Sequence, residues 1–181
     1  MLCWVVLGGL VAEYWLVERP RARRADVVPA RRRFVPVRPG EVREVRLSRE
    51  GRTVVSRREG DVWAVLDPPG SSIPPDLIAA FANALTEAEE IARVAGADAE
   101  PDTYGLGPRA TRVELRGEAG EAVVVRIGGA NPTGTAVYAR REASPDIVLI
   151  GRNVRYYEDL IFQALSAARV PSADGDVPVG G

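Results

Sequence analysis

The sequence predicts an α+β fold, with a mostly antiparallel sheet of meanders and hairpins covered by two helices and preceded by one N-terminal transmembrane helix. Three observations predict it. Short alternating apolar and polar runs, separated by glycine turns, follow Glu41. Two longer stretches carry apolar residues at helical spacing. The opening stretch, Met1 to Val17, is apolar apart from Glu13.

The length of 181 residues suits one folded domain together with terminal segments. Glu13 lies near the end of the apolar stretch, where its carboxylate can reach the lipid headgroups. Arginines and prolines dominate the residues that follow, which favours an extended linker over a helix. We expect an anchor at 1–17, a linker at 18–40, an α+β domain at 41–170 and a disordered tail at 171–181.

The first half of the domain contains three short strand patterns, EVREVRLS, RTVVSRR and VWAVLD, separated by turns at Gly51 and Gly60. Their short spacing predicts an antiparallel meander with Trp63 on the buried face. The stretch from Ser72 to Gly96 then predicts one amphipathic helix, which Ser72 could cap and Gly96 could end.

The second half predicts four more strands and a helix beginning at Asn153. The glycine-rich stretch RIGGANPTGTAVYARR raises the question of a phosphate-binding loop. Such a loop needs a helix N-terminus after it, and TAVYARR is a strand pattern instead. We therefore expect a wide hairpin, in which Gly128, Gly129 and Gly134 allow positive φ.

The composition excludes much catalytic and cofactor chemistry. All 24 basic residues are arginine, histidine is absent, and Cys3 is the lone cysteine. Schiff-base chemistry, histidine general bases and intramolecular disulfides are therefore excluded. GLGPRA resembles a dinucleotide fingerprint but precedes a strand, and the acidic residues from Asp98 to Asp102 lack the glycine of a calcium loop. We expect no cofactor, no metal and no catalytic residue, although a carboxylate pair remains open.

The formal net charge of −1 gives no general attraction for nucleic acid, so none is expected as a partner. The linker, by contrast, is locally basic and suits contact with anionic lipid or with a protein partner. The residues expected to make that contact are Arg21, Arg23, Arg24, Arg31, Arg32 and Arg33.

Several stretches together resemble the bacterial family named domain of unknown function 4340. They are VWAVLDPPGSSIPPDLIAAFANAL, YGLGPRATRVELRG, VVVRIGG, GTAVYARR and DIVLIG, and the resemblance covers most of Glu41 to Ala168. The chain departs from it at Gly107, where many members carry an acidic residue. The resemblance implies a membrane-anchored protein auxiliary to gliding-motility-type ABC transporter components, and it implies no catalytic residues.

The leading functional hypothesis is a membrane-anchored, non-catalytic binding or scaffolding component, with protein partners in a transporter-linked complex. A carboxylate-dependent hydrolase acting on envelope saccharides is the alternative, and a peripheral anionic-lipid sensor is a further one. The linker arginines would place the domain in the cytoplasm by the positive-inside rule. The resemblance implies the outside, and we expect an extracytoplasmic domain on a single-pass anchor.

Overall fold

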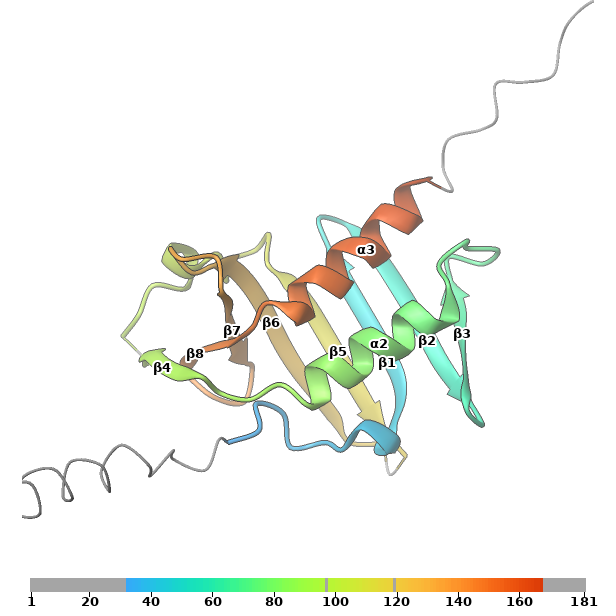
Figure 1. Ribbon diagram of the computed structural model, residues 1–181, viewed down its shortest axis with the longest axis horizontal. Helices are drawn as coiled ribbons and strands as arrows, with labels where there is room; N and C mark the ends of the chain where they lie inside the picture. Colours follow the sequence, from blue (N-terminus) through green and yellow to red (C-terminus); the bar gives the residue numbers. More distant parts are fainter. Residues whose placement is uncertain (1–31, 97, 119, 168–181) are drawn as a thin grey trace, which may run out of the picture. The chain divides into compact units, whose positions relative to one another are not determined.

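The computed structural model describes residues 32–96, 98–118 and 120–167 (Figure 1). Eight strands within these ranges form one antiparallel sheet, and two α-helices accompany it, which confirms the predicted α+β class. The helix expected over 1–17 lies outside the described residues. The strands are β1 (Val42–Arg49), β2 (Arg52–Glu59), β3 (Val62–Asp67), β4 (Ala92–Ala95), β5 (Thr111–Gly117), β6 (Ala122–Ala130), β7 (Ala136–Arg141) and β8 (Ile147–Gly151).

The sheet is two meanders joined side by side, in the order β3-β2-β1-β5-β6-β7-β8-β4. The first meander, β1 to β3, was expected from its glycine turns, and β5 to β8 form the second. β1 pairs with β5 in antiparallel register, with Val45 opposite Leu115 and Leu47 opposite Val113. Because side chains alternate along a strand, these residues share the face of the sheet that is buried.

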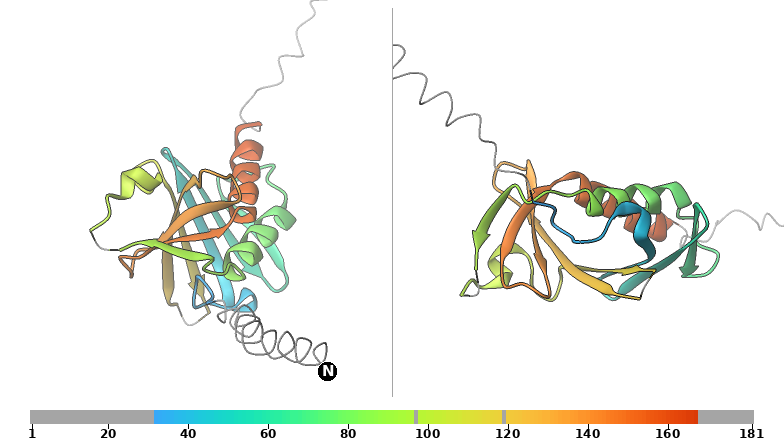
Figure 2. Two further views of the ribbon diagram at one scale, coloured as in Figure 1. Left: turned by 60° about the vertical axis from the view of Figure 1, so that its left-hand side comes forward. Right: turned by 90° about the horizontal axis from the view of Figure 1, so that it is seen from below.

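Both helices, α2 (Pro75–Thr86) and α3 (Asn153–Ala167), cover that buried face (Figure 1). The right-hand view of Figure 2 shows them lying along one side of a curved sheet. Their apolar residues pack on alternate strand residues in one core, in which Phe81, Ile161 and Phe162 are among the largest buried side chains. We call the opposite side of the sheet the outer face. No helix among the described residues is long and apolar enough to span a bilayer.

The folded body extends upstream of the boundary expected at Glu41. Phe34 and Val35 belong to the core and are 1% and 0% exposed. The backbone N–H of Phe34 donates to the carbonyl of Ala88, and the N–H of Glu90 donates to that of Arg32. The residues just before the short 3-10 helix η1 (Pro39–Glu41) are therefore packed against the body rather than acting as a free spacer.

The prediction of one helix from Ser72 to Gly96 is wrong for the second half of this stretch. α2 ends at Thr86, and the following residues run extended into β4, which pairs with β8 at the edge of the sheet. The Thr86 hydroxyl donates to the carbonyl of Ala82, so it closes the last turn of the helix. Sheet pairing and the backbone bonds to Phe34 and Arg32 outweigh the helical propensity of the glutamate-rich stretch.

The wide hairpin is confirmed, but the glycine explanation is only partly right. Gly134 has φ +68° in the connection between β6 and β7. Gly128 and Gly129 lie within β6 and have no positive φ. A Cβ at Gly128 would lie 2.4 Å from the carbonyl oxygen of Tyr104, so that glycine is required by the close approach of another backbone segment.

Candidate anion-binding cleft

Three arginines from three neighbouring strands form a row across the outer face. Arg112 of β5 lies opposite Arg126 of β6, and Arg126 lies opposite Arg140 of β7. Ser48 of β1 lies on the other side of Arg112 and extends the row. Direct cross-strand partners project from the same face, and neighbouring strands are about 4.8 Å apart. The register therefore places three guanidinium groups side by side.

This arginine row forms the floor of an open cleft of about 570 Å³. One wall is the β1–β2 turn, from Ser48 to Gly51. The opposite wall is the loop before β5, with Pro101, Asp102 and the stretch from Leu106 to Pro108. No described residue that lines the cleft is aromatic. Stacking on a base or sugar ring is therefore not offered there, and charge and hydrogen bonding are the means of recognition.

The loop wall is held on the outer face by close packing against β6. It begins with the 3-10 helix η2 (Pro101–Tyr104), which the left-hand view of Figure 2 shows on the side of the sheet away from α2 and α3. The Leu106 side chain is buried over Gly128. The Tyr104 ring meets the Tyr138 ring edge-on, with centroids 5.0 Å apart.

The next loop residue, Gly107, lies beside the side chain of Asp102. A Cβ there would lie 1.8 Å from the Asp102 Oδ1 atom, so the Asp102 carboxylate occupies the space beside it.

Two glutamates neutralise one side of the arginine row. The Glu142 Oε1 atom lies 3.3 Å from Arg112 Nε and 3.4 Å from Arg126 Nη2. Glu114 is shared between Arg112 and Arg116. Hydrogen bonds from Arg116 first, then from Arg112, hold the pKa of Glu114 below its usual value against the opposing effect of burial.

On the other side of the row, a positive charge lacks an ion-pair partner and a hydrogen-bond donor lacks an acceptor in the part of the chain that the structure describes. Arg140 is half-buried at the end of the row and has no ion-pair partner within the described ranges. The buried Nε atom of Arg126 has no hydrogen-bond partner there either. A guanidinium group carries five donors and stays charged at all physiological pH values. The cleft can therefore accept an additional anionic group at this side.

A second charged cluster lies behind the same strand ends, on the helix side of the sheet. Glu158 of α3 is fully buried, accepts a hydrogen bond from the Thr111 hydroxyl, and lies 2.9 Å from Arg49 Nη1. Arg49 also contacts Asp159 at 2.6 Å and stacks over the Phe162 ring at 4.2 Å. These contacts clamp α3 to β1 and β5.

Burial is the main influence on the Glu158 carboxyl, and it raises the pKa although the Thr111 hydrogen bond and the arginines act in the opposite direction. Its second oxygen, Oε2, has no hydrogen-bond partner among the described residues. Because the side chain is fully buried, a substrate cannot touch it in this conformation. We assign the cluster to the stability of the fold rather than to chemistry.

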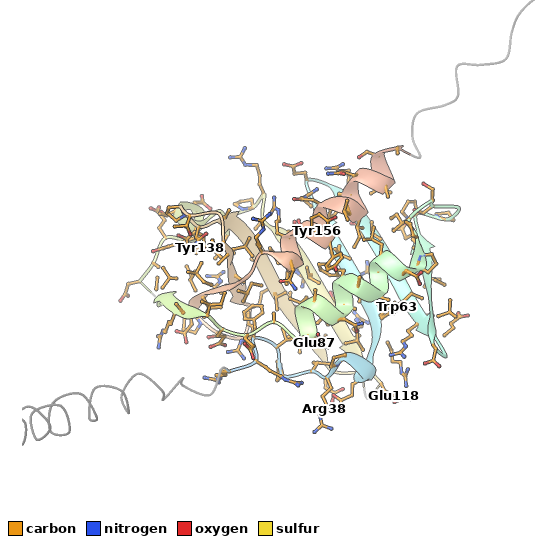
Figure 3. All side chains as sticks on the ribbon, in the orientation of Figure 1. Arg38, Trp63, Glu87, Glu118, Tyr138 and Tyr156 are labelled. Atoms are coloured by element: carbon orange, nitrogen blue, oxygen red, sulfur yellow. The ribbon has the colours of Figure 1, made fainter. Side chains whose placement is uncertain are left out.

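A smaller cavity of about 270 Å³ lies at the opposite ends of β5 and β6, lined by Glu41, Glu118 and Glu121 among others. Figure 3 labels Glu118 at that end of the molecule and Tyr138 well away from it. Two of its glutamates are already paired, Glu41 with Arg38 and Glu118 with Arg43. Its small volume and its acidic lining make it a poorer anion site than the arginine cleft.

The residues expected to touch lipid or a partner are only partly described. Arg32 and Arg33 are exposed and border the backbone of Glu89 and Glu90. The others, Arg21, Arg23, Arg24 and Arg31, lie outside the described residues. The cleft arginines were missed because each looked like an ordinary solvent-facing strand residue. In TRVELRG, VVVRIGG and AVYARR the arginines fall at the alternating positions that face away from the core. That shared direction was the feature of the sequence that could have revealed the row.

No group of potential metal ligands large enough to hold an ion occurs in the described ranges. The chain matches no family model, no curated protein and no solved structure. The arrangement of its own residues is therefore the basis for assigning a role.

Proposed function

We propose that this protein is a membrane-anchored, non-catalytic binding component, auxiliary to a transport or envelope assembly. Its folded domain holds an anionic group of the bound ligand or partner in the arginine cleft. The observation that carries the proposal is Arg140, a half-buried guanidinium on the cleft floor without an ion-pair partner among the described residues. A charge in that position is stabilised when an anion arrives.

The kinds of side chain in the cleft favour binding over catalysis. Arginine does not exchange a proton near neutral pH, so the arginine row supplies charge and orientation but no general acid or base. The cleft carboxylates Glu50 and Asp102 are exposed, and Glu50 is paired with Arg52 at 3.7 Å. The hydrolase alternative needs an acidic group on either side of a substrate. Glu50 and Asp102 do lie on opposite walls, but both are exposed and Glu50 is already paired with Arg52, so the described cleft lining offers no buried carboxyl to act as a general acid.

Titration of the folded domain with sodium sulfate tests the anion site, with total ionic strength held constant by chloride. We expect saturable binding with a dissociation constant on the order of 1 mM, reported by amide chemical shifts around the cleft. Arg140→Gln should weaken binding about tenfold, the usual worth of one charge-assisted hydrogen bond. Arg43→Gln is the matched control, because Arg43 is paired with Glu118 outside the cleft.

Equal weakening by the two substitutions would show only a general charge effect and would contradict the proposed cleft. Absence of saturable binding to the wild-type domain would contradict it as well. For the assembly, the full-length chain extracted in detergent should co-purify with membrane partners. A monodisperse anchored protein without a partner would count against that part of the proposal.

Exposure of Arg32 and Arg33 favours a second role at the membrane surface. In this role the linker arginines would hold the domain near anionic lipid, each contributing about 1 kcal/mol near the surface. Binding to vesicles containing an anionic phospholipid should then fall steeply with added salt. Binding that survives high salt unchanged would exclude this electrostatic contact.

A further inference from the structure

We propose that the arginine cleft selects a doubly charged tetrahedral oxyanion, such as a terminal phosphate group, and that Glu142 sets this selectivity. The inference rests on the proposed function and adds the chemical class of the ligand. In this view Glu142 is a resident counter-ion. It occupies one part of the arginine row permanently and leaves the rest for the ligand.

The position of Glu142 supports the counter-ion role. Its carboxylate bridges Arg112 and Arg126, which are direct neighbours in the row. Its backbone is fixed to the sheet, because the Glu142 N–H donates to the carbonyl of Val124 at 2.9 Å. The side chain is only 36% exposed. One carboxylate is thus attached at the edge of the arginine row and covers two of its three arginines.

Charge counting over the connected groups indicates how much negative charge the ligand should bring. The row and its attached ion pairs contain four guanidinium groups, Arg112, Arg116, Arg126 and Arg140, and two carboxylates, Glu114 and Glu142. Within this connected set, four positive charges less two negative charges leave a surplus of two, and Asp102 on the loop wall lowers the total for the whole cleft to one. A dianion placed on the arginine row balances the surplus of the row, whereas a monoanion there leaves one of its positive charges uncompensated.

The shape of the donor set favours a tetrahedral group over a planar one. The cleft floor presents donors from adjacent strands, with arginines along the row and the Ser48 hydroxyl, which also bonds the Thr53 hydroxyl, at its β1 end. A planar carboxylate offers only two oxygens in one plane, and Glu142 contacts both Arg112 and Arg126 through one of them, Oε1. A terminal phosphate carries three acceptor oxygens and can meet Arg126, Arg140 and a further donor together.

The walls add a second feature of the ligand. Asp102 is exposed on the loop wall and has no ion pair among the described residues. Its carboxylate disfavours further negative charge at that wall but accepts a hydrogen bond from a hydroxyl group. The cleft lining lacks aromatic rings, so a nucleobase finds no stacking partner there. A phosphate on a hydroxylated, non-aromatic carrier fits this surface.

The first measurement compares simple anions on the wild-type domain at pH 8 and constant ionic strength. Sulfate and inorganic phosphate are both doubly charged there, whereas acetate is a planar monoanion. We expect the two tetrahedral dianions to bind about tenfold more tightly than acetate, the gain of one charge-assisted contact. Equal affinities would overturn the selectivity and leave the proposed anion site intact. Absence of binding by every anion would instead remove the proposed function itself.

The second measurement uses Glu142→Ala, which removes the resident carboxylate and vacates its place. Acetate should then occupy that place, so its affinity should rise about three- to tenfold and the preference for sulfate should narrow. Glu118→Ala is the control, since Glu118 is exposed and pairs with Arg43 away from the cleft. Circular dichroism melting of both variants establishes that they are folded. Unchanged acetate affinity in folded Glu142→Ala would overturn the role of Glu142.

Two further titrations distinguish a soluble phosphate ligand from the phosphate of a lipid headgroup. Glycerol 3-phosphate represents a soluble ligand, and vesicles containing a phosphatidic acid, which carries a terminal phosphate, represent a lipid headgroup. A probe that competes with sulfate for the wild-type protein, but no longer competes in Arg140→Gln, is identified as the source that reaches the cleft. If neither competes although sulfate binds, the phosphate class is wrong and only a simple inorganic anion is held.

Discussion

Gly128→Ala tests whether the loop wall of the cleft can pack closely on β6 only because residue 128 has no side chain. The Cβ built at this position lies 2.4 Å from the Tyr104 carbonyl oxygen and 3.0 Å from Leu106 Cγ and Cδ2. The first distance is too short for any real contact, and the atom it meets is backbone. Either the loop moves away from β6 or the strand bends to accommodate the methyl group.

The magnitude follows from comparison with the neighbouring glycine. Gly129 also lies in β6, and its Cβ would meet only the Tyr104 carbonyl oxygen, at 3.7 Å. Each alanine restricts the unfolded chain equally, which stabilises both variants by about 0.4–1 kcal/mol. The difference between the variants therefore isolates the steric cost, about 1–3 kcal/mol for a methyl group forced into a packed site.

The assay is chemical denaturation of wild type, Gly128→Ala and Gly129→Ala, followed by sulfate titration of each folded variant. We expect Gly128→Ala alone to lose stability, and its sulfate affinity to fall because Leu106 and Gly107 shift with the loop. Equal unfolding free energies for the two variants would refute the close packing of the loop on β6. Loss of stability with full sulfate affinity would show that the loop is not a functional wall.

The remaining predictions concern the entry of the chain and the buried glutamate. Phe34→Ala should destabilise the domain by about 3–5 kcal/mol, because Phe34 is 1% exposed in the core. A loss of unfolding free energy below about 1 kcal/mol, measured with denaturant, would show that Phe34 is not part of the core. Burial raises the pKa of Glu158 above its usual 4.5, so the unfolded chain releases this proton first as the pH rises. Stability should therefore fall as the pH rises from about 4.5 through the folded-state pKa. Glu158→Gln should lack this fall in stability. If melting curves show the same difference in stability between wild type and Glu158→Gln at every pH, the prediction is contradicted.

The fold was predictable to the extent that local patterns decide it. Alternating residues and glycine turns defined most strands, and the helical stripe around Phe81 defined α2. β4 was missed because its residues have helical propensity and become extended only through pairing with β8 and through the backbone bonds to the segment at Phe34. Such pairing joins residues far apart in the sequence, which a local pattern does not contain.

The cleft was not predictable for a related reason. Arg112, Arg126 and Arg140 form a row only because the register brings these three positions opposite one another. A shift of one residue in either pairing would move an arginine to the other face of the sheet. The burial of Glu158 likewise follows from the packing of α3 across Thr111 and Arg49, which bring together residues far apart in the sequence.

The most direct test of the anion site is a crystal structure of the folded domain, residues 32–167, grown or soaked with sulfate. Phe34 and Leu165, near the two ends of this fragment, belong to one core. We predict a sulfate ion on the cleft floor, within hydrogen-bonding distance of Arg126 and Arg140, with Glu142 still bridging Arg112 and Arg126. An empty cleft with sulfate bound at other arginines, such as Arg32 or Arg33, would contradict it.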